Sequence, residues 1–507
     1  MGYTARLHSA RTGAADAWAT GAPQRRLHPA LAPLVTLLLC TSLPAIARSP
    51  MPSPTEQVPI AAAKEIQGDR PKGQIHATPF RQKTTPLKQV SPNNGRYFFE
   101  RGLERLQNGD FSGAIEDFDA TLARLETESS TTRNDGSVIT PALVYYNRGN
   151  AYLQLRAVKA AQDNYDRAIE LNPDFTHAYI NRGVTRRAAG DFDGAIADYD
   201  RAITLNPNDA DTYYNRANVY RIQGNWDGAI ADYGKALDLK PDYANAYINR
   251  AVIYHQQGNL DAALGDIGAA LAINDQLPEA FYNRGLIRSE QQENLGAIAD
   301  FTQVLTLQPR NARAHVKRGI IYHRLRKYDA ARRDYDQAIA INDKLAEAYN
   351  MRGLSKVAQG KLSLAINDYN AAIRINPDYT NAYVNRGIAY HRSKAYSKAI
   401  ADYTSAINLD GKSASAFHLR GLSFQASGNS GQAIPNFTQA IALRQDYADP
   451  HVNRAIAYWA QQARGGDRDR FRQLASQDLA TAQQIYERQG NEAGLATVAR
   501  VRSQFQR

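Results

Sequence analysis

A 34-residue period runs through most of this chain. A glycine or an alanine recurs at this spacing without a slip, and we call these positions the anchors. The ten in register are Gly149, Gly183, Ala217, Ala251, Gly285, Gly319, Gly353, Gly387, Gly421 and Ala455. An eleventh anchor, Gly102, lies upstream and is offset by 13 extra residues around Glu126 to Pro141. A fixed period of this length indicates stacked repeats, each of which buries its core against its neighbours.

Each period has the pattern of two antiparallel helices. In the repeat that begins at Thr176, Tyr179 and Gly183 lie at helical spacing, and Ala195 and Tyr199 do so further along. Small residues recur where two helices must approach closely, and aromatic residues fill the space between hairpins. The spacing therefore predicts one helical hairpin per repeat and an all-α fold.

The expected ends of these helices carry turn and capping residues. Gly190 is predicted to end the first helix, and Asp193 to cap the second through its carboxylate. The repeat then closes at Asn206 and Pro207, because proline cannot continue a helix.

The small, aromatic, alanine and proline positions all recur in phase, and together they resemble the tetratricopeptide repeat family over residues 97–490. The resemblance implies about eleven repeats in an α-solenoid, a right-handed superhelix whose concave face is lined by the first helix of each hairpin. Residues 491–507 are expected to form a helix that caps the last apolar face. In the last repeat we interpret the extra residues between Gln462 and Gln473 as a polar loop.

Residues 1–47 have the features of a secretory signal peptide. Arg25 and Arg26 precede an apolar run of 13 residues, and Ala45 and Ala47 supply a small-x-small cleavage pattern. We expect cleavage after Ala47 and export to the periplasm or another extracytoplasmic space. A start of translation at Met51 instead predicts a cytosolic protein.

Two further features of the N-terminal region bear on function. Cys40 is the single cysteine, so a chain cleaved after the signal has no thiol chemistry, whereas a retained membrane anchor or lipidation at Cys40 stays open. Residues 48–96 contain eight prolines and scattered basic residues without periodicity, which predicts a flexible basic linker. Peripheral contact of this linker with an anionic membrane is the alternative to a solvated tether.

The basic charge is concentrated before the repeats. Residues 1–96 carry +8 of the net charge of +11, which leaves +3 for the array. A nucleic-acid binder is expected to show a basic stripe along its repeats. We therefore expect no nucleic-acid partner.

An arginine precedes every anchor, and sixteen residues after the arginine stands an acid or its amide in nearly every repeat. Arg250 and Asp266, for example, fall on facing helices. We predict a ladder of partly buried pairs that fixes the register of the two helices, since an unpaired buried charge is costly. Anion binding by the arginines is the alternative.

An asparagine stands one residue before the arginine in most repeats. Its amide offers a donor and an acceptor to a peptide backbone, so a spaced row can hold an extended chain. The row resembles that in the repeats of the O-linked N-acetylglucosamine transferase, which implies peptide binding on the concave face; surface amides without a role are the alternative. We expect the ligand along the stretch Asn147, Asn181, Asn215, Asn249 and Asn283.

Aromatic and basic side chains at neighbouring positions are expected to complete this partner-binding face. They are Tyr146, Tyr214, Tyr282, Arg187, Arg221 and His255. His255, His323 and His391 are each two repeats apart, too far to share a metal whose ligands lie about 2 Å away. We expect neither a metal nor a cofactor.

The sequence contains no nucleophile elbow, phosphate loop or zinc-ligand spacing. We therefore expect a non-enzymatic scaffold or adaptor that binds a partner peptide or helix along its concave face. One alternative is a noncatalytic subunit that presents substrates to an enzyme such as a glycosyltransferase. A nucleic-acid-binding helical repeat is the weakest alternative, and homo-oligomerisation stays open.

Overall fold

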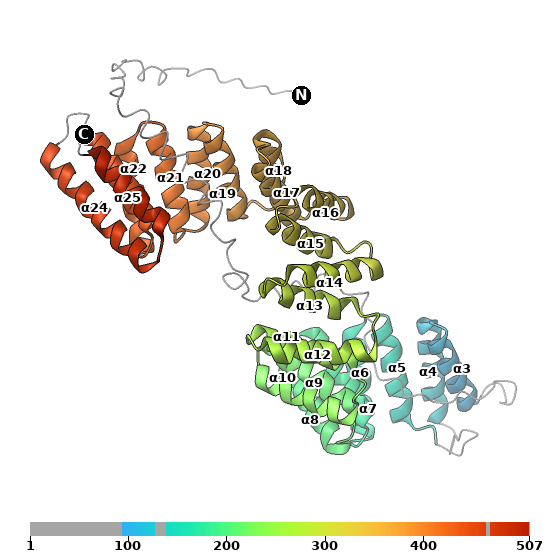
Figure 1. Cartoon of the computed structure of the whole chain (residues 1–507). Helices are drawn as coiled ribbons and strands as arrows, with labels where there is room; N and C mark the ends of the chain where they lie inside the picture. The colour runs from blue at the N-terminus through green and yellow to red at the C-terminus, as the bar shows by residue number, and fades with distance from the viewer. Residues whose placement is uncertain (1–93, 127–137, 463–466, 506–507) are drawn as a thin grey trace, which may run out of the picture. The chain divides into compact units, whose positions relative to one another are not determined.

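The computed structural model describes residues 94–126, 138–462 and 467–505, and Figure 1 shows that these residues are folded into helices. They form 23 α-helices, and no β-strand occurs among them. None of these helices has both the length and the apolar character needed to cross a bilayer. The expected signal peptide, the linker as far as residue 93, and Cys40 lie outside the described residues.

The chain divides into two compact units, one ending at Asp343 and one beginning at Lys344. The N-terminal unit holds seven helical hairpins. Its helices are α3 (Gly95–Gln107), α4 (Phe111–Leu125), α5 (Pro141–Gln154), α6 (Val158–Leu171), α7 (Thr176–Ala189), α8 (Phe192–Leu205), α9 (Ala210–Gln223), α10 (Trp226–Leu239), α11 (Ala244–Gln256), α12 (Leu260–Ile273), α13 (Pro278–Glu290), α14 (Asn294–Leu307), α15 (Ala312–Arg324) and α16 (Tyr328–Ile341). The array begins at Gly95, two residues before the predicted boundary.

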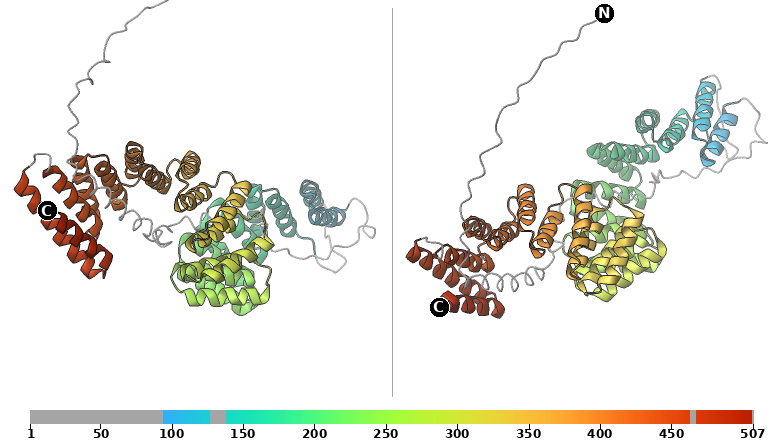
Figure 2. Two further views of the ribbon diagram at one scale, coloured as in Figure 1. Left: turned by 45° about the horizontal axis from the view of Figure 1, so that its top comes forward. Right: turned by 90° about the horizontal axis from the view of Figure 1, so that it is seen from above.

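The C-terminal unit continues with four hairpins and a final helix. Its helices are α17 (Ala346–Ala358), α18 (Leu362–Ile375), α19 (Thr380–Arg392), α20 (Tyr396–Leu409), α21 (Ala414–Ala426), α22 (Ser430–Leu443), α23 (Ala448–Gln462), α24 (Arg468–Arg488) and α25 (Glu492–Phe505). Within each unit, the second helix of one hairpin packs on the first helix of the next, and most successive first helices are also in contact. Figure 2 shows the hairpins of each unit following one another in chain order. Each unit is thus an α-solenoid, as the period predicts.

The hairpin α7–α8 shows how the local sequence sets the turn. Gly190 ends α7 with φ of +86°, a left-handed conformation that glycine adopts without strain, which confirms its predicted role. The expected cap at Asp193 is wrong. The N-cap is Asp191, whose side chain accepts a hydrogen bond from the Gly194 amide, while Asp193 lies in the first turn, where its charge favours the helix dipole.

The anchors are small because a ring from the facing helix covers them. A Cβ on Gly183 would lie 2.7 Å from Cε1 of Tyr199, closer than real Cβ atoms come to a ring. Ala195, Tyr199 and Ala202 of α8 are fully buried beside it. The same arrangement recurs at Gly319 and Gly387, so the period reflects one repeated contact between ring and backbone.

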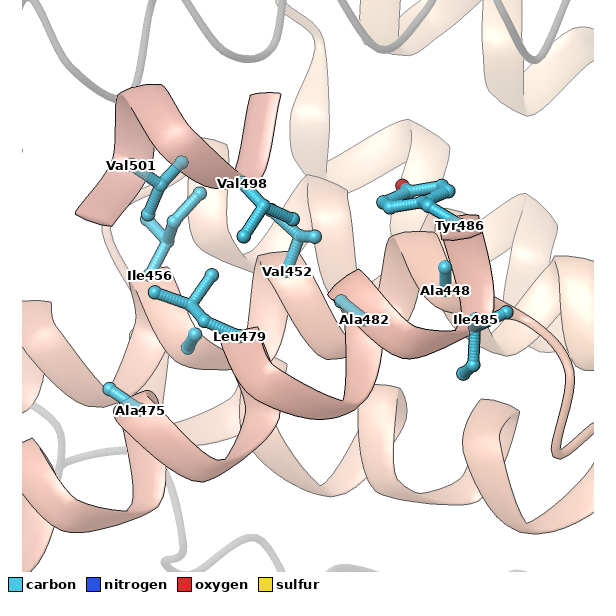
Figure 3. Packing of buried hydrophobic residues seen from close by; sticks show 11 residues of the cluster. Ala448, Val452, Ile456, Ala475, Leu479, Ala482, Ile485, Tyr486, Val498 and Val501 are labelled. Atoms are coloured by element: carbon cyan, nitrogen blue, oxygen red, sulfur yellow. The ribbon is translucent and has the colours of Figure 1, made fainter. Parts of the chain in front are cut away.

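The array ends in an apolar cluster that α25 covers. Val452 and Ile456 of α23 and Leu479 of α24 pack against Val498 and Val501 of α25 (Figure 3). The helix in the predicted capping segment thus covers the last hairpin. The polar loop predicted over Gln462–Gln473 is wrong in its second half, because α24 already begins at Arg468 and the extra residues lengthen that helix.

Candidate partner-binding face

The arginines before the anchors are engaged inside the hairpins. In Arg250, Nε and Nη2 each donate to the Asp266 carboxylate at 2.8 Å, and both residues are largely buried. The hydrogen bond from Asp266 raises the pKa of Arg250, against the opposing effect of burial. Equivalent pairs join Arg101 to Asp117, Arg182 to Asp198, Arg216 to Asp232, Arg284 to Asp300, Arg318 to Asp334, Arg352 to Asp368 and Arg386 to Asp402. The predicted ladder is confirmed.

Several of these arginines also link neighbouring hairpins. Nη1 of Arg182 donates to Asp166 at 2.7 Å, and Nη1 of Arg216 donates to Asp200 at 2.6 Å. Arg250 has no such second partner, because the residue at the corresponding position is Gly234, which has no side chain to accept a hydrogen bond. The guanidinium groups are therefore committed to the fold.

The asparagine row, by contrast, divides into two kinds of residue. Asn181 is fully buried, and its Nδ2 donates to the Tyr146 hydroxyl at 3.2 Å and to Asn150 Oδ1 at 2.8 Å. Asn249 repeats this arrangement with Tyr214 and Asn218, at 3.1 Å to each. These two asparagines join a first helix to the preceding one.

The other three asparagines differ. Asn147 is buried, and its amide donates to the Leu143 carbonyl at 2.8 Å in its own helix. Asn215 and Asn283 are partly exposed, and within the described residues their amides form no hydrogen bond. The row is thus not one exposed surface, and its free amides are those of Asn215 and Asn283.

The asparagines differ because the residue three positions before the anchor alternates in type, with a period of 68 residues. Alternate hairpins carry a polar side chain there, and the hairpins between them carry an aliphatic one. The polar series is Tyr146, Tyr214, Tyr282, Asn350 and His418, and the aliphatic series is Ile180, Ile248, Val316, Val384 and Val452. We call the contact that follows a polar residue a polar junction and the contact that follows an aliphatic residue an apolar junction.

In the C-terminal unit, polar junctions use different side chains in the same geometry. Asn385 Nδ2 donates to Asn350 Oδ1 at 3.0 Å, and Asn453 Nδ2 lies 3.0 Å from His418 Nε2. A tyrosine 29 residues beyond the polar residue closes the arrangement, with Tyr379 3.2 Å from Asn350 and Tyr447 2.6 Å from His418. The alternation is therefore a property of the repeats and is not confined to one residue type.

The predicted aromatic side chains of the face lie mostly inside the polar junctions. Tyr146 is fully buried against Tyr165 and Phe175, and burial raises its pKa to about 12. Tyr214 is partly exposed and packs on Tyr243, with ring centroids 4.7 Å apart. Tyr282, also partly exposed, packs edge-on against Phe301. Tyr146 accordingly contributes no surface to a partner.

The predicted basic residues of the face are all partly exposed. His255 Nε2 lies 2.8 Å from a carboxylate oxygen of Glu290 in α13, so this side chain bridges two first helices. Arg187 in α7 and Arg221 in α9 form no ion pair within the described residues. His391, by contrast, is buried and bonds to the Ser423 hydroxyl at 2.8 Å. No three His, Cys, Asp or Glu side chains converge as metal ligands among the described residues.

Sequence reasoning found the row but missed its division. The signal was present: Asn150 and Asn218 follow the anchors Gly149 and Ala217 in alternate repeats, where Val184 and Val252 stand in the others. A search at 34 residues treats all repeats as equal, whereas a search at 68 residues separates them.

Repeated hairpins joined in this way define a helical-repeat protein with its first helices side by side. Segments throughout the array match known repeat sequences. The family described as tetratricopeptide repeat matches residues 142–175, 244–276, 282–346 and 380–413, and the description TPR repeat matches residues 185–221, 217–258 and 353–394. The chain belongs to the tetratricopeptide repeat family, whose members commonly bind protein or peptide partners.

The solved structures that match this chain are only distantly similar to it. A tetratricopeptide repeat protein from Parabacteroides merdae is 20% identical over 49% of this chain and 98% of its own, with a TM-score of 0.41. Tom70 from yeast is 15% identical over 81% and 96%, with a TM-score of 0.38. YrrB, described as having an unusual peptide-binding site, is 20% identical over 39% and 97%, with a TM-score of 0.32. No curated protein matches the sequence.

Proposed function

We propose that this chain is a non-enzymatic scaffold that binds an extended segment of a partner protein along the first helices of its N-terminal unit. One observation carries the proposal. In a row where Asn181 and Asn249 are held by neighbouring helices, Asn215 and Asn283 are partly exposed with both amide groups free. A free amide can donate to a peptide carbonyl and accept from a peptide N–H.

The spacing of the two free amides suits an extended chain. They lie on α9 and α13, two hairpins apart, and packed helices are separated by roughly 8 to 10 Å. Two such steps give roughly 20 Å, which about six residues of extended chain span at 3.3 Å each. The two asparagines thus suit a short linear segment held at both ends.

The test uses the full chain and chemical crosslinking in its own cellular fraction. The variant with Asn215→Ala and Asn283→Ala is compared with a matched control, Asn245→Ala and Asn381→Ala. These control residues are exposed and likewise form no hydrogen bond within the described residues. We expect the parent and the control to capture the same partner and the first variant to lose it with an unchanged circular dichroism spectrum. Equal capture by all three contradicts the proposed site.

We further propose that the partner is met outside the cytoplasm. The support is the signal-peptide pattern before Ala47 together with the proline-rich basic linker after it. Fractionation of a C-terminally tagged full chain tests this. Recovery from the cytosol with residues 1–47 intact contradicts export.

A further inference from the structure

Arg187 and Arg221 differ from the arginines that precede the anchors. Each stands four residues after its anchor, in the consecutive helices α7 and α9, and each is partly buried. The arginines that precede the anchors all bond an acid or an amide, but neither Arg187 nor Arg221 has an acidic partner within the described residues. Nε of Arg221 is moreover buried with no hydrogen-bond partner.

The groups around these two arginines leave them without a counter-charge. Burial raises the pKa of Tyr199, and the charge of Arg187 opposes that rise. The Tyr199 hydroxyl is itself buried and unpartnered. Arg221 opposes the rise in the pKa of Tyr233 through its charge and through a hydrogen bond, and the Tyr233 hydroxyl donates to Asn218 at 2.7 Å.

Helix α7 contains no acidic residue, and the acids on α8 and α9 are engaged elsewhere, Asp200 of α8 by Arg216. Asp198 is held by Arg182 and Arg186. Asp211 at the start of α9 acts on the Tyr243 hydroxyl, whose pKa burial and this carboxylate both raise. Asp193 accepts a hydrogen bond from Gln223 at 3.0 Å. A partly buried pair of cations without an anion is an unfavourable arrangement that a bound carboxylate relieves.

The free amide of Asn215 lies in α9, the helix that also carries Arg221. Asn181 reaches residues 146 and 150 of the preceding first helix, so Asn215 by equivalence faces Ile180 and Val184 of α7. Val184 is one helical turn before Arg187. Arg187 thus follows, one turn further along α7, the residues that Asn215 faces.

We propose that the bound segment carries an acidic side chain, Asp or Glu, whose carboxylate pairs with Arg187 and Arg221 next to the backbone contact at Asn215. This assignment rests on the proposed function, because it places the carboxylate on the peptide that Asn215 holds. An arginine fork suits a carboxylate better than a point charge does, since it offers two parallel N–H donors.

The test is selection of short random peptides displayed on phage against the immobilised full chain. Three proteins are panned in parallel: the parent, the variant Arg187→Gln with Arg221→Gln, and the control Arg310→Gln. Arg310 is exposed and has no partner within the described residues. Circular dichroism establishes that all three are folded, and one enriched peptide is then titrated with its acid changed to the matching amide.

We expect the parent and the control to enrich peptides with Asp or Glu at one fixed position, and the double variant to enrich peptides without that preference. Amidation of the acid should weaken binding to the parent by about tenfold or more and leave binding to the double variant unchanged. Enriched peptides without an acidic position overturn the carboxylate assignment and leave the proposed function standing. Failure of the folded parent to enrich any peptide overturns both.

Discussion

Polar and apolar junctions place an asparagine at the same repeat position, but its amide is engaged in one and free in the other. In the polar junction between α5 and α7, the buried Asn181 of α7 donates to Tyr146 and Asn150 of α5. In the apolar junction between α7 and α9, Ile180 takes the tyrosine position and Asn215 keeps its amide free. The same residue at the same repeat position can therefore be structural in one repeat and available for binding in the next.

The difference follows from what each junction can satisfy. A buried amide needs partners, and the polar junction supplies a hydroxyl and a second amide as acceptors for Nδ2 of Asn181, whose Oδ1 is buried without a partner. An apolar junction offers only side-chain volume, so an asparagine there is tolerable only where it reaches solvent. Free hydrogen-bonding groups therefore occur at every second hairpin of this stretch.

The largest expected effect concerns the polar junction built on His418. This side chain is fully buried, and burial lowers its pKa from the ordinary 6.5 to about 4. Between pH 6.5 and pH 4 the unfolded chain therefore binds a proton at this histidine and the folded chain does not. The free energy of unfolding is unaffected above about pH 6.5 and falls as the pH drops toward 4, by about 3 kcal/mol in total.

Urea unfolding near pH 7 and near pH 4.5 measures this loss. His418→Asn reproduces the Asn350 junction without a titrating group and should reduce the acid sensitivity by about 2 kcal/mol. His391, whose pKa burial also lowers to about 4, should account for part of the sensitivity that remains. An unchanged pH profile in the variant contradicts a neutral buried His418.

The second prediction compares one asparagine from each kind of junction. Asn181→Ala removes two hydrogen bonds from α7 to α5, so the free energy of unfolding should fall by about 1 to 3 kcal/mol. Asn215→Ala removes no bond within the described residues and should change it by less than about 0.5 kcal/mol. Equal losses in chemical denaturation would remove the distinction between the junctions.

The third prediction uses the tyrosines that cover the anchors. Tyr165 donates its hydroxyl proton to Asn150 at 2.8 Å, whereas the buried Tyr199 hydroxyl has no partner. Tyr165→Phe should therefore destabilise by about 1 kcal/mol, and Tyr199→Phe should be neutral or stabilise by up to about 1 kcal/mol. Phe301 occupies the equivalent position over the anchor Gly285, so a phenylalanine fits there. Thermal unfolding measures the sign of the stability change in both variants. A loss of stability in Tyr199→Phe as large as that in Tyr165→Phe contradicts this prediction.

The smallest effect is expected from converting part of one junction into the other. Val184→Asn places an amide where Asn150 stands in the polar hairpin and gives the Tyr199 hydroxyl an acceptor. The new hydrogen bond gains about 1 kcal/mol and the lost aliphatic burial costs a similar amount, so the net change should stay within about 1 kcal/mol. In a Tyr199→Phe background the same change should be worse by about 1 kcal/mol, which a double-mutant cycle detects.

Much of the fold was readable from the sequence because one contact repeats. A ring opposite each anchor and an acid opposite each arginine recur at fixed offsets, so Gly183, Tyr199 and the Arg250–Asp266 pair could be placed without coordinates. The cap was misplaced because acids stand at both 191 and 193, and spacing alone does not say which one accepts the amide proton.

The site was less readable because exposure depends on the neighbouring repeat. Nothing in the residues around Asn181 and Asn215 alone says that one is locked and the other free. The difference lies 35 residues earlier, in Tyr146 or Ile180. The start of α24 was also missed, since the polar residues after Arg468 look like a loop but form the solvent side of a longer helix.

The alternation makes 68 residues, and not 34, the step by which this array can change length. Loss of the single hairpin α9–α10 would bring Asn249 against Ile180. The Asn249 amide would then lie beside an aliphatic side chain and lose its hydrogen-bond partners. Loss of α9–α12 together would bring Asn283 against Ile180, a pairing like the native one of Asn215. Shorter or longer natural versions of such an array should therefore differ from it by whole pairs of hairpins, as should engineered ones that fold well.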